Sequence, residues 1–327
     1  MKTILISGAT GFLGTHLLAA LRREEPEARL RVLARGAGAI AQMDGVEVVR
    51  GDITKPAEVI AAAAGVDEIY HAAGFVERQS LRPWRLYDAH VEGTRNVCEA
   101  MLAHGVKKAV FVSSSGTCAV GADPVERDET APFSQQIVWN WPYYLSKIYA
   151  EKLADWYVTH RGLDIVHVNP TLLLGPGDDR RSSTGDVELF LKGGIMVLPS
   201  GGLNIVDVRD AAMGLILAMR KGRKGERYLL GGANMTFHEW IQRTAKIAGV
   251  SAPKLMLPLP LQLLGARIMR RVLPLAGKRW ELDDASIEMS AVYWYCSSKK
   301  ARQELGFTTR DPQETLTETV AYLRSSS

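Results

Sequence analysis

The amino-terminal part of the chain alternates short apolar runs with amphipathic stretches of helical spacing. The apolar runs lie at residues 2–7, 30–35, 46–52, 66–74 and 108–112. Helical stretches such as 56–64 and 89–104 separate them. This alternation predicts an α/β fold built on a parallel, doubly wound sheet. Because such sheets bind ligands at the carboxyl ends of their strands, the residues that follow each run are the first candidates for a site.

Three glycines follow the first apolar run, in the spacing G-x-x-G-x-x-G. Gly8 can take backbone angles closed to other residues, Gly11 lets a ligand approach the main chain, and Gly14 lets a helix pack close to the strand. A loop that only needs unusual torsions could have the same glycines. The position between a strand and a helix start, however, favours a pyrophosphate site at the helix N-terminus. The cofactor-binding residues predicted in this turn are Gly8, Thr10, Gly11, Phe12, Leu13 and Gly14.

The ends of the next strands indicate which dinucleotide is bound. A carboxylate after the second run would bind the ribose 2′-hydroxyl of NAD, but the chain has Arg35 there. A guanidinium can pair with the extra phosphate of NADP(H), so we predict NADP(H). NAD(H) is the alternative if Arg35 is only a solvated strand-end charge. Asp52 and Ile53 are predicted to contact the adenine, and the small residues Ala72, Ala73 and Gly74 are predicted to lie along the cofactor.

A tyrosine and a lysine in the middle of the chain are the strongest catalytic candidates. Tyr143 and Lys147 are four residues apart, so they share one face of a predicted helix. A neighbouring ammonium favours the phenolate, and we expect Lys147 to lower the pKa of Tyr143 from its reference of about 10. A serine from 113–115, at the end of the fifth run, could bind a substrate carbonyl and stabilise an oxyanion.

These motifs, in this order, resemble the extended short-chain dehydrogenase/reductase family. The nearest branch is dihydroflavonol-reductase-like, with 3β-hydroxysteroid dehydrogenase-like enzymes and hopanoid-associated sugar epimerase-type proteins. The resemblance implies that Tyr143 is the general acid/base, that Lys147 tunes it and holds the nicotinamide ribose, and that Ser114 is the catalytic serine, with Ser115 as the alternative. It also implies that Pro170 and Thr171 line the nicotinamide. Further segments that carry the resemblance are 51–53, 71–73, 91–96, 112–117 and 169–177.

The resemblance also implies a domain organisation. A dinucleotide-binding Rossmann domain would occupy residues 1–172, joined by 203–232, and a smaller, mainly substrate-binding domain would occupy 173–327. A homodimer is expected on the same ground.

Two positions depart from the family pattern. His90 stands where relatives usually have the asparagine associated with the proton relay, so either His90 replaces it or that part of the pattern is unused. Asn204 stands where nucleotide-sugar enzymes usually have an arginine, and a sugar diphosphate therefore loses an expected partner. We thus predict an enzyme that reduces a ketone or oxidises a secondary alcohol on a fairly hydrophobic small molecule. A nucleotide-sugar epimerase or dehydratase is the alternative, and a non-catalytic dinucleotide sensor has no use for Tyr143 and Lys147.

Aromatic and apolar residues outside the strand ends could line the substrate pocket. The candidates are Trp84, Trp139, Trp141, Phe190 and Met196. The stretch 255–275 is apolar but carries Arg267, Arg270 and Arg271. It is too short and too charged to span a bilayer. We favour a helix that covers the pocket over an interfacial helix that makes peripheral membrane contact.

Composition narrows the remaining function classes. The chain of 327 residues is 46% hydrophobic and 23% charged, with a net charge of only +4. Because no basic run is interleaved with aromatics, a nucleic-acid partner is not expected. Cys98, Cys118 and Cys296 have neither metal nor disulfide spacing, so we expect no metal site. Met1 leads directly into a predicted strand, and a cytoplasmic location is the expectation.

Overall fold

The largest element of the structure is a parallel sheet of seven strands. The computed structural model describes residues 1–36, 38, 40, 43, 45–77, 82–276 and 282–326. The strand order is β10-β6-β5-β4-β1-β2-β3, and every neighbouring pair is parallel. The predicted α/β fold is therefore confirmed. The strands are β1 (Thr3–Ser7), β2 (Arg29–Ala34), β3 (Val46–Arg50), β4 (Glu68–His71), β5 (Lys108–Val112), β6 (Ile165–Pro170) and β10 (Arg227–Leu230).

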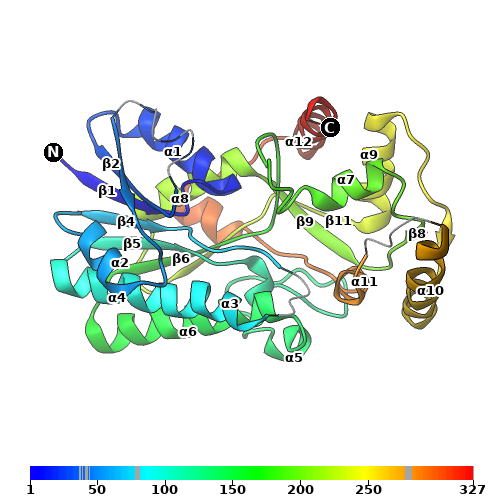
Figure 1. Cartoon of the computed structure of the whole chain (residues 1–327), viewed down its shortest axis with the longest axis horizontal. Helices are drawn as coiled ribbons and strands as arrows, with labels where there is room; N and C mark the ends of the chain where they lie inside the picture. Colours follow the sequence, from blue (N-terminus) through cyan, green and yellow to red (C-terminus); the bar gives the residue numbers. More distant parts are fainter. Residues whose placement is uncertain are drawn as a thin grey trace.

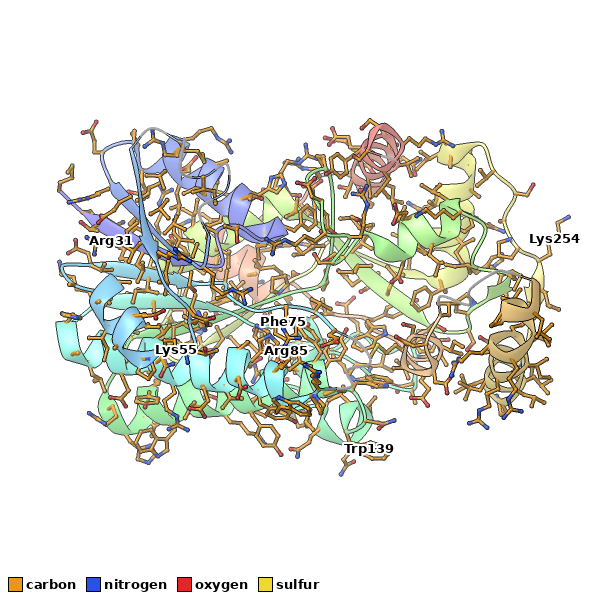
Figure 2. All side chains as sticks on the ribbon, in the orientation of Figure 1. Arg31, Lys55, Phe75, Arg85, Trp139 and Lys254 are labelled. Atoms are coloured by element: carbon orange, nitrogen blue, oxygen red, sulfur yellow. The ribbon has the colours of Figure 1, made fainter. Side chains whose placement is uncertain are left out.

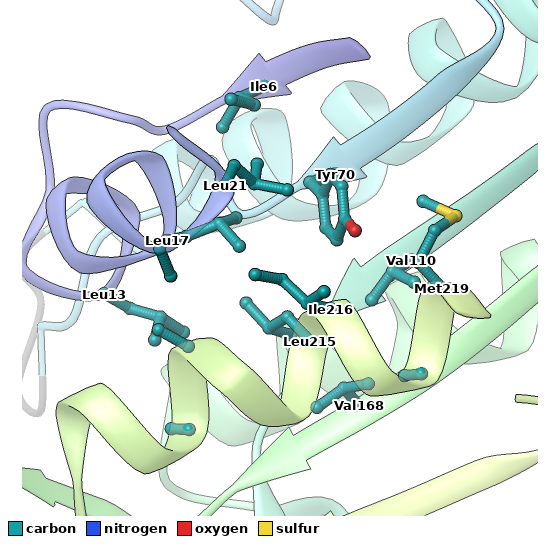
Figure 3. Packing of buried hydrophobic residues seen from close by; sticks show 14 of the residues in the cluster. Ile6, Leu13, Leu17, Leu21, Tyr70, Val110, Val168, Leu215, Ile216 and Met219 are labelled. Atoms are coloured by element: carbon teal, nitrogen blue, oxygen red, sulfur yellow. The ribbon is translucent and has the colours of Figure 1, made fainter. Parts of the chain in front are cut away.

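Helices cover both faces of this sheet (Figure 1). Successive residues of β1 alternate between the faces: Ile4 and Ile6 pack with one helical layer and Leu5 with the other. The first layer consists of α1 (Phe12–Glu24) and α8 (Val208–Lys221). Figure 3 shows Leu17 and Leu21 of α1 and Leu215 and Ile216 of α8 meeting above the sheet. The second layer consists of α2 (Pro56–Ala62), α4 (Gly93–His104) and α6 (Pro142–Arg161).

The second half of the chain adds a smaller unit beyond the carboxyl ends of the large sheet (Figure 1). Its centre is a three-stranded sheet of β7 (Leu172–Leu174), β9 (Gly202–Asp207) and β11 (Ala233–Thr236). Three helices pack on this sheet around Trp240 and Ile241: α7 (Gly185–Leu191), α9 (Phe237–Ala248) and α12 (Pro312–Ser325). The outermost elements are β8 (Val197–Leu198), β12 (Leu255–Met256), α10 (Leu259–Val272), a 3₁₀ turn η4 (Leu273–Ala276) and α11 (Asp284–Met289).

Short elements connect the strand ends to the helices. They are α3 (Trp84–Tyr87), the π-helical turn η2 (Asp88–Glu92), the 3₁₀ turn η3 (Ser115–Thr117), α5 (Gln135–Val138) and the π-helical turn η5 (Ala301–Leu305). The predicted strand at 66–74 is shorter in the structure, since β4 contains only Glu68–His71. The backbone of Ala72 then packs directly against Gly8 of the glycine turn. Among the described residues, no helix combines the length and the apolar character needed to cross a bilayer.

Candidate active site

A cavity of about 880 Å³ lies between the carboxyl ends of the large sheet and the smaller unit. At one end the glycine turn and the loops after β4, β5 and β6 line it. At the other end α10 and α11 line it. The predicted cofactor residues found in its wall are Gly8, Gly11, Phe12, Leu13, Gly14, Ala72, Gly74, Tyr143, Lys147, Pro170 and Thr171. The predicted residues that do not line it are Thr10, Arg35, Asp52, Ile53 and Ala73.

The glycine turn has the close packing and the open amides that a pyrophosphate site needs. Gly8 has φ of 81°, and a Cβ there would lie 2.5 Å from the backbone of Ala72. A Cβ on Gly14 would lie 2.1 Å from the carbonyl oxygen of Gly8, so α1 approaches the turn closely. The first turn of α1 has no side-chain cap and no acidic residue. Its amide groups and its positive helix end therefore fit a bound pyrophosphate.

The two charged residues predicted for the adenosine end lie next to each other at the sheet edge. Arg35 directly follows β2 and is exposed. Burial raises the pKa of Asp52, but hydrogen bonds from Thr54 and the charge of Arg35 outweigh it and leave that pKa lowered. Because the backbone N–H and hydroxyl of Thr54 donate to Asp52 Oδ1 at 2.9 Å, this carboxylate also holds its own turn. Ile53 packs beside Gly93 at the start of α4.

Tyr143 and Ser114 are brought together in the cavity wall. Tyr143 lies in the first turn of α6 and is partly buried, and this burial is the main reason that its pKa is raised. The neighbouring Tyr144 adds to this shift, while a side-chain hydrogen bond with Ser114 opposes it. Ser115 also lines the cavity, but it begins the 3₁₀ turn η3. Of the two candidate serines, the structure thus pairs Ser114 with the phenol.

The expected effect of Lys147 on the phenol is not observed. The pKa of Tyr143 is raised by burial, whereas the sequence predicted that Lys147 would lower it. The Lys147 ammonium instead donates to the carbonyl oxygen of Val112 at 2.9 Å, at the end of β5. Burial lowers the pKa of Lys147 to about 8, and Glu151 partly opposes this. The raised pKa favours the neutral, protonated form of the Tyr143 phenol.

A buried polar network contacts Ser113 and Ser114, and the sequence patterns did not predict it. Glu151 is 2% exposed, and its carboxylate accepts from the Ser113 hydroxyl, from Asn169 Nδ2 at 2.8 Å and from Arg227 Nε at 2.9 Å. Asn169 Nδ2 also donates to the backbone carbonyl of Ser114 at 3.0 Å. The network therefore binds the hydroxyl of Ser113 in a hydrogen bond and fixes the backbone carbonyl of Ser114. Helical spacing could have found Glu151, because it follows Lys147 by four residues on α6.

His90 lies beside the lysine, in the π-helical turn η2. Its Nδ1 is 2.8 Å from the Ser146 hydroxyl, and its Nε2 is buried. A Cβ on Gly74 would lie 2.8 Å from Nε2 and 3.6 Å from the Lys147 ammonium, so Gly74 keeps this space open. Burial and the charge of Lys147 lower the pKa of His90 well below its usual value. A buried imidazole with a lowered pKa thus adjoins the catalytic candidates.

The aromatic wall of the cavity differs from the one predicted. Met196 does line the cavity, but Trp84 and Trp139 are exposed on the surface, and Trp141 and Phe190 are buried in the core. The prediction failed because surface, core and pocket aromatics have similar sequence surroundings. The residues that form the apolar end are Met196, Phe237, Trp240, Leu257, Leu261, Met269, Ile287, Met289 and Trp294.

Asn204 lines the same cavity and is fully engaged within the protein. Its Oδ1 accepts from the backbone N–H of Gly232 at 3.0 Å, and its Nδ2 donates to Asn234 Oδ1 at 2.7 Å. This side chain ties β9 to β11 and its neighbouring loop. Because the Asn204 amide is uncharged, it offers no positive charge to a diphosphate. In the described part of the chain, no cluster of three or more His, Cys, Asp or Glu side chains could hold a metal ion.

Comparisons with known proteins agree with this geometry. The model of the NAD dependent epimerase/dehydratase family matches residues 4–231. A putative dihydroflavonol 4-reductase of Synechocystis sp. is 30% identical, over 98% of this chain and 94% of the relative. Sterol demethylase protein B of Methylococcus capsulatus is 31% identical, over 98% of both chains. The dTDP-glucose 4,6-dehydratase of Streptomyces venezuelae, solved with NAD bound, has a TM-score of 0.77 over 99% of this chain and 97% of its own, and at 22% identity it supports the fold alone.

Proposed function

Because the chain belongs to the NAD dependent epimerase/dehydratase family, we propose that it is an NADP(H)-dependent oxidoreductase that interconverts a ketone and a secondary alcohol on a hydrophobic substrate. The observation that carries this proposal is the pairing of Tyr143 with Ser114 inside the cavity. The glycine turn lies at one end of that cavity and apolar side chains lie at the other. A reactive carbonyl between the two ends would meet both hydroxyls.

In the proposed reduction the side chains supply the proton and hold the oxygen. The bound nicotinamide would supply the hydride. Ser114 donates a hydrogen bond to the substrate oxygen and stabilises the negative charge that develops there. Tyr143 gives its hydroxyl proton to the same oxygen, and its neutral state suits it to this step. Lys147, anchored on the carbonyl oxygen of Val112 at the end of β5, would hold the nicotinamide ribose.

The substrate end of the cavity supports a hydrophobic molecule. Side chains such as Met269, Ile287 and Trp294 offer apolar contact, and the rings of Tyr144 and Trp294 lie 4.9 Å apart at an angle of 34°. This aromatic pair suits a flat or polycyclic carbon skeleton. The names of two relatives, a dihydroflavonol reductase and a sterol demethylase protein, support the same substrate class. The engaged side chain of Asn204 weighs against a sugar diphosphate.

The test is a Tyr143→Phe variant assayed for NADPH oxidation with a panel of hydrophobic ketones. Loss of the proton donor is expected to lower kcat by about 10²-fold or more. Tyr149→Phe is the matched control, since Tyr149 lies on the same helix but is 40% exposed and outside the cavity wall. Normal turnover by Tyr143→Phe would refute the proposal. Conversion of a nucleotide sugar without net NADPH consumption would favour an epimerase.

The preference for NADP(H) rests on Arg35. Its guanidinium is exposed at the end of β2 and would pair with the ribose phosphate of NADP(H). Arg35→Asp is expected to raise KM for NADPH strongly and to change KM for NADH little or favourably. Initial rates with both cofactors measure this. An equal loss with NADPH and NADH would contradict the assignment.

A further inference from the structure

The helix α10 presents two different faces. Gln262, Gly265 and Met269 line the cavity, and only Ala266 of this helix is buried. A second group of large apolar side chains, 50% to 87% exposed, forms what we call the apolar stripe. The members of the stripe are Leu261, Leu264, Ile268, Val272 and Leu275. The spacing of three or four residues places the first four within about a quarter of the circumference of α10, and Leu275 follows in the 3₁₀ turn η4.

Positive charge accompanies the apolar stripe. Between residues 251 and 276 the sequence contains Lys254, Arg267, Arg270 and Arg271 and no aspartate or glutamate. Arg270 points away from the stripe and pairs with Asp284 of α11 at 2.6 Å. Arg267 and Arg271 are exposed, and by helical spacing they lie along the flank of the stripe that faces away from the cavity. Neither has an acidic partner within the described residues.

We propose that the apolar stripe docks on the surface of an anionic phospholipid bilayer. An apolar helix face flanked by arginines lies in the headgroup region with its charges against lipid phosphates. A second copy of the chain fits less well, because a contact between two stripes would gather arginines of both copies at one interface without acidic partners from the stripe. Figures 1 and 2 show α10 and Lys254 at the end of the molecule opposite β1 and β2, where a flat surface could reach them.

Docking would also place the α10 wall of the cavity at the bilayer. Leu261 belongs to the apolar stripe and lines the cavity as well, so an apolar path leads from the exposed face of α10 to its inner face. A lipophilic substrate dissolved in the bilayer could then enter without crossing water. This part of the inference rests on the proposed hydrophobic substrate. The docking itself does not, because vesicle binding is measured without turnover.

The experiment is co-sedimentation of the full chain with vesicles of phosphatidylcholine, alone or mixed with phosphatidylglycerol. We expect binding to the mixed vesicles that weakens at high salt. Leu264→Glu combined with Ile268→Glu should lower partitioning at least about tenfold. Arg267→Gln combined with Arg271→Gln should lower it by about 30-fold, since each arginine near an anionic surface contributes to binding. Val125→Glu, which changes another half-exposed apolar residue, should bind as the unmodified protein does.

The outcomes separate docking from catalysis and from dimerisation. None of the four exchanged α10 residues lines the cavity, so turnover of a water-soluble ketone should remain unchanged and report intact folding. Failure of the unmodified protein to bind mixed vesicles would overturn the proposal, as would equal binding by the double glutamate variant. A dimer that this variant loses, in the absence of vesicle binding, would assign the apolar stripe to a second copy instead.

Discussion

The two ends of the cavity are built in opposite ways. At the sheet end, backbone atoms pack against backbone atoms at Gly8 and Gly14, and the buried carboxylate of Glu151 fixes the serine loop. At the α10 end, only Ala266 of the helix is buried, and Gly265 has open space around it. The structure therefore holds the atoms proposed for chemistry on rigid, buried elements. It places the atoms proposed for substrate selection on a peripheral helix.

This contrast has a physical reason. Hydride and proton transfer require atoms held to a fraction of an ångström, which needs locked rotamers and satisfied hydrogen bonds. Recognition of an apolar substrate needs only shape and the exclusion of water. The outer helix can consequently expose one face to a second surface while it lines the cavity with the other. The four substitutions below test this difference, from the largest expected effect to the smallest.

Gly14→Ala should be the most damaging change at the sheet end. The new methyl group would lie 2.1 Å from the backbone oxygen of Gly8, and neither backbone can yield without moving β1. We expect a loss of more than about 3 kcal/mol in unfolding free energy, together with weakened dinucleotide binding. Urea unfolding and cofactor titration measure both. A variant with the midpoint of the unmodified protein would show that the turn is less tightly packed than the structure indicates.

Glu151→Gln should cause the second-largest loss of unfolding free energy, because it leaves the largely buried Arg227 without its charged partner. Removing one member of a buried ion pair costs about 3 kcal/mol. The matched control is Glu239→Gln, where the pair with Arg243 is exposed and the expected loss is below about 1 kcal/mol. Urea unfolding of the two variants gives the comparison. Similar losses in both would contradict a special role for the buried network.

Lys147 should make stability depend on pH. Burial lowers its pKa from 10.5 to about 8, so between these values the unfolded chain binds more protons than the folded chain. Stability from this group therefore rises as pH increases through that window. Relative to Lys147→Met, the unmodified protein should gain about 2 to 3 kcal/mol between about pH 7 and pH 10. A difference that stays constant with pH would mean that the ammonium is not buried.

Gly265→Ala should have the smallest effect and the opposite sign. The added methyl group meets no atom of the described residues within 4 Å, and alanine favours a helix over glycine by up to about 1 kcal/mol. We expect a slightly more stable protein that accepts bulky ketones less well, because the cavity becomes narrower there. Thermal unfolding and a substrate-size series measure the two effects. Destabilisation like that of Gly14→Ala would remove the contrast between the two ends.

Much of the sheet end followed from local sequence patterns. A strand, a tight turn and a helix start are specified by neighbouring residues, so the spacing of Gly8, Gly11 and Gly14 predicted their place in the wall. Helical periodicity similarly placed Tyr143 and Lys147 on one face of α6. The alternation of apolar runs and helices predicted the parallel sheet.

The tertiary structure decided which serine pairs with Tyr143, in which direction the pKa of Tyr143 shifts and which aromatic residues line the cavity. Glu151, Asn169 and Arg227 come from different elements and contact one another only in the folded chain. There the Ser113 hydroxyl donates to Glu151, and Ser114 is the serine that hydrogen-bonds with Tyr143. Burial, which no short stretch of sequence specifies, reversed the expected pKa shift of Tyr143. The same holds for the aromatic wall: whether Trp84 or Trp294 reaches the cavity depends on contacts between distant segments. Local order follows from adjacent residues, whereas burial and long-range pairing depend on the packing of the whole chain.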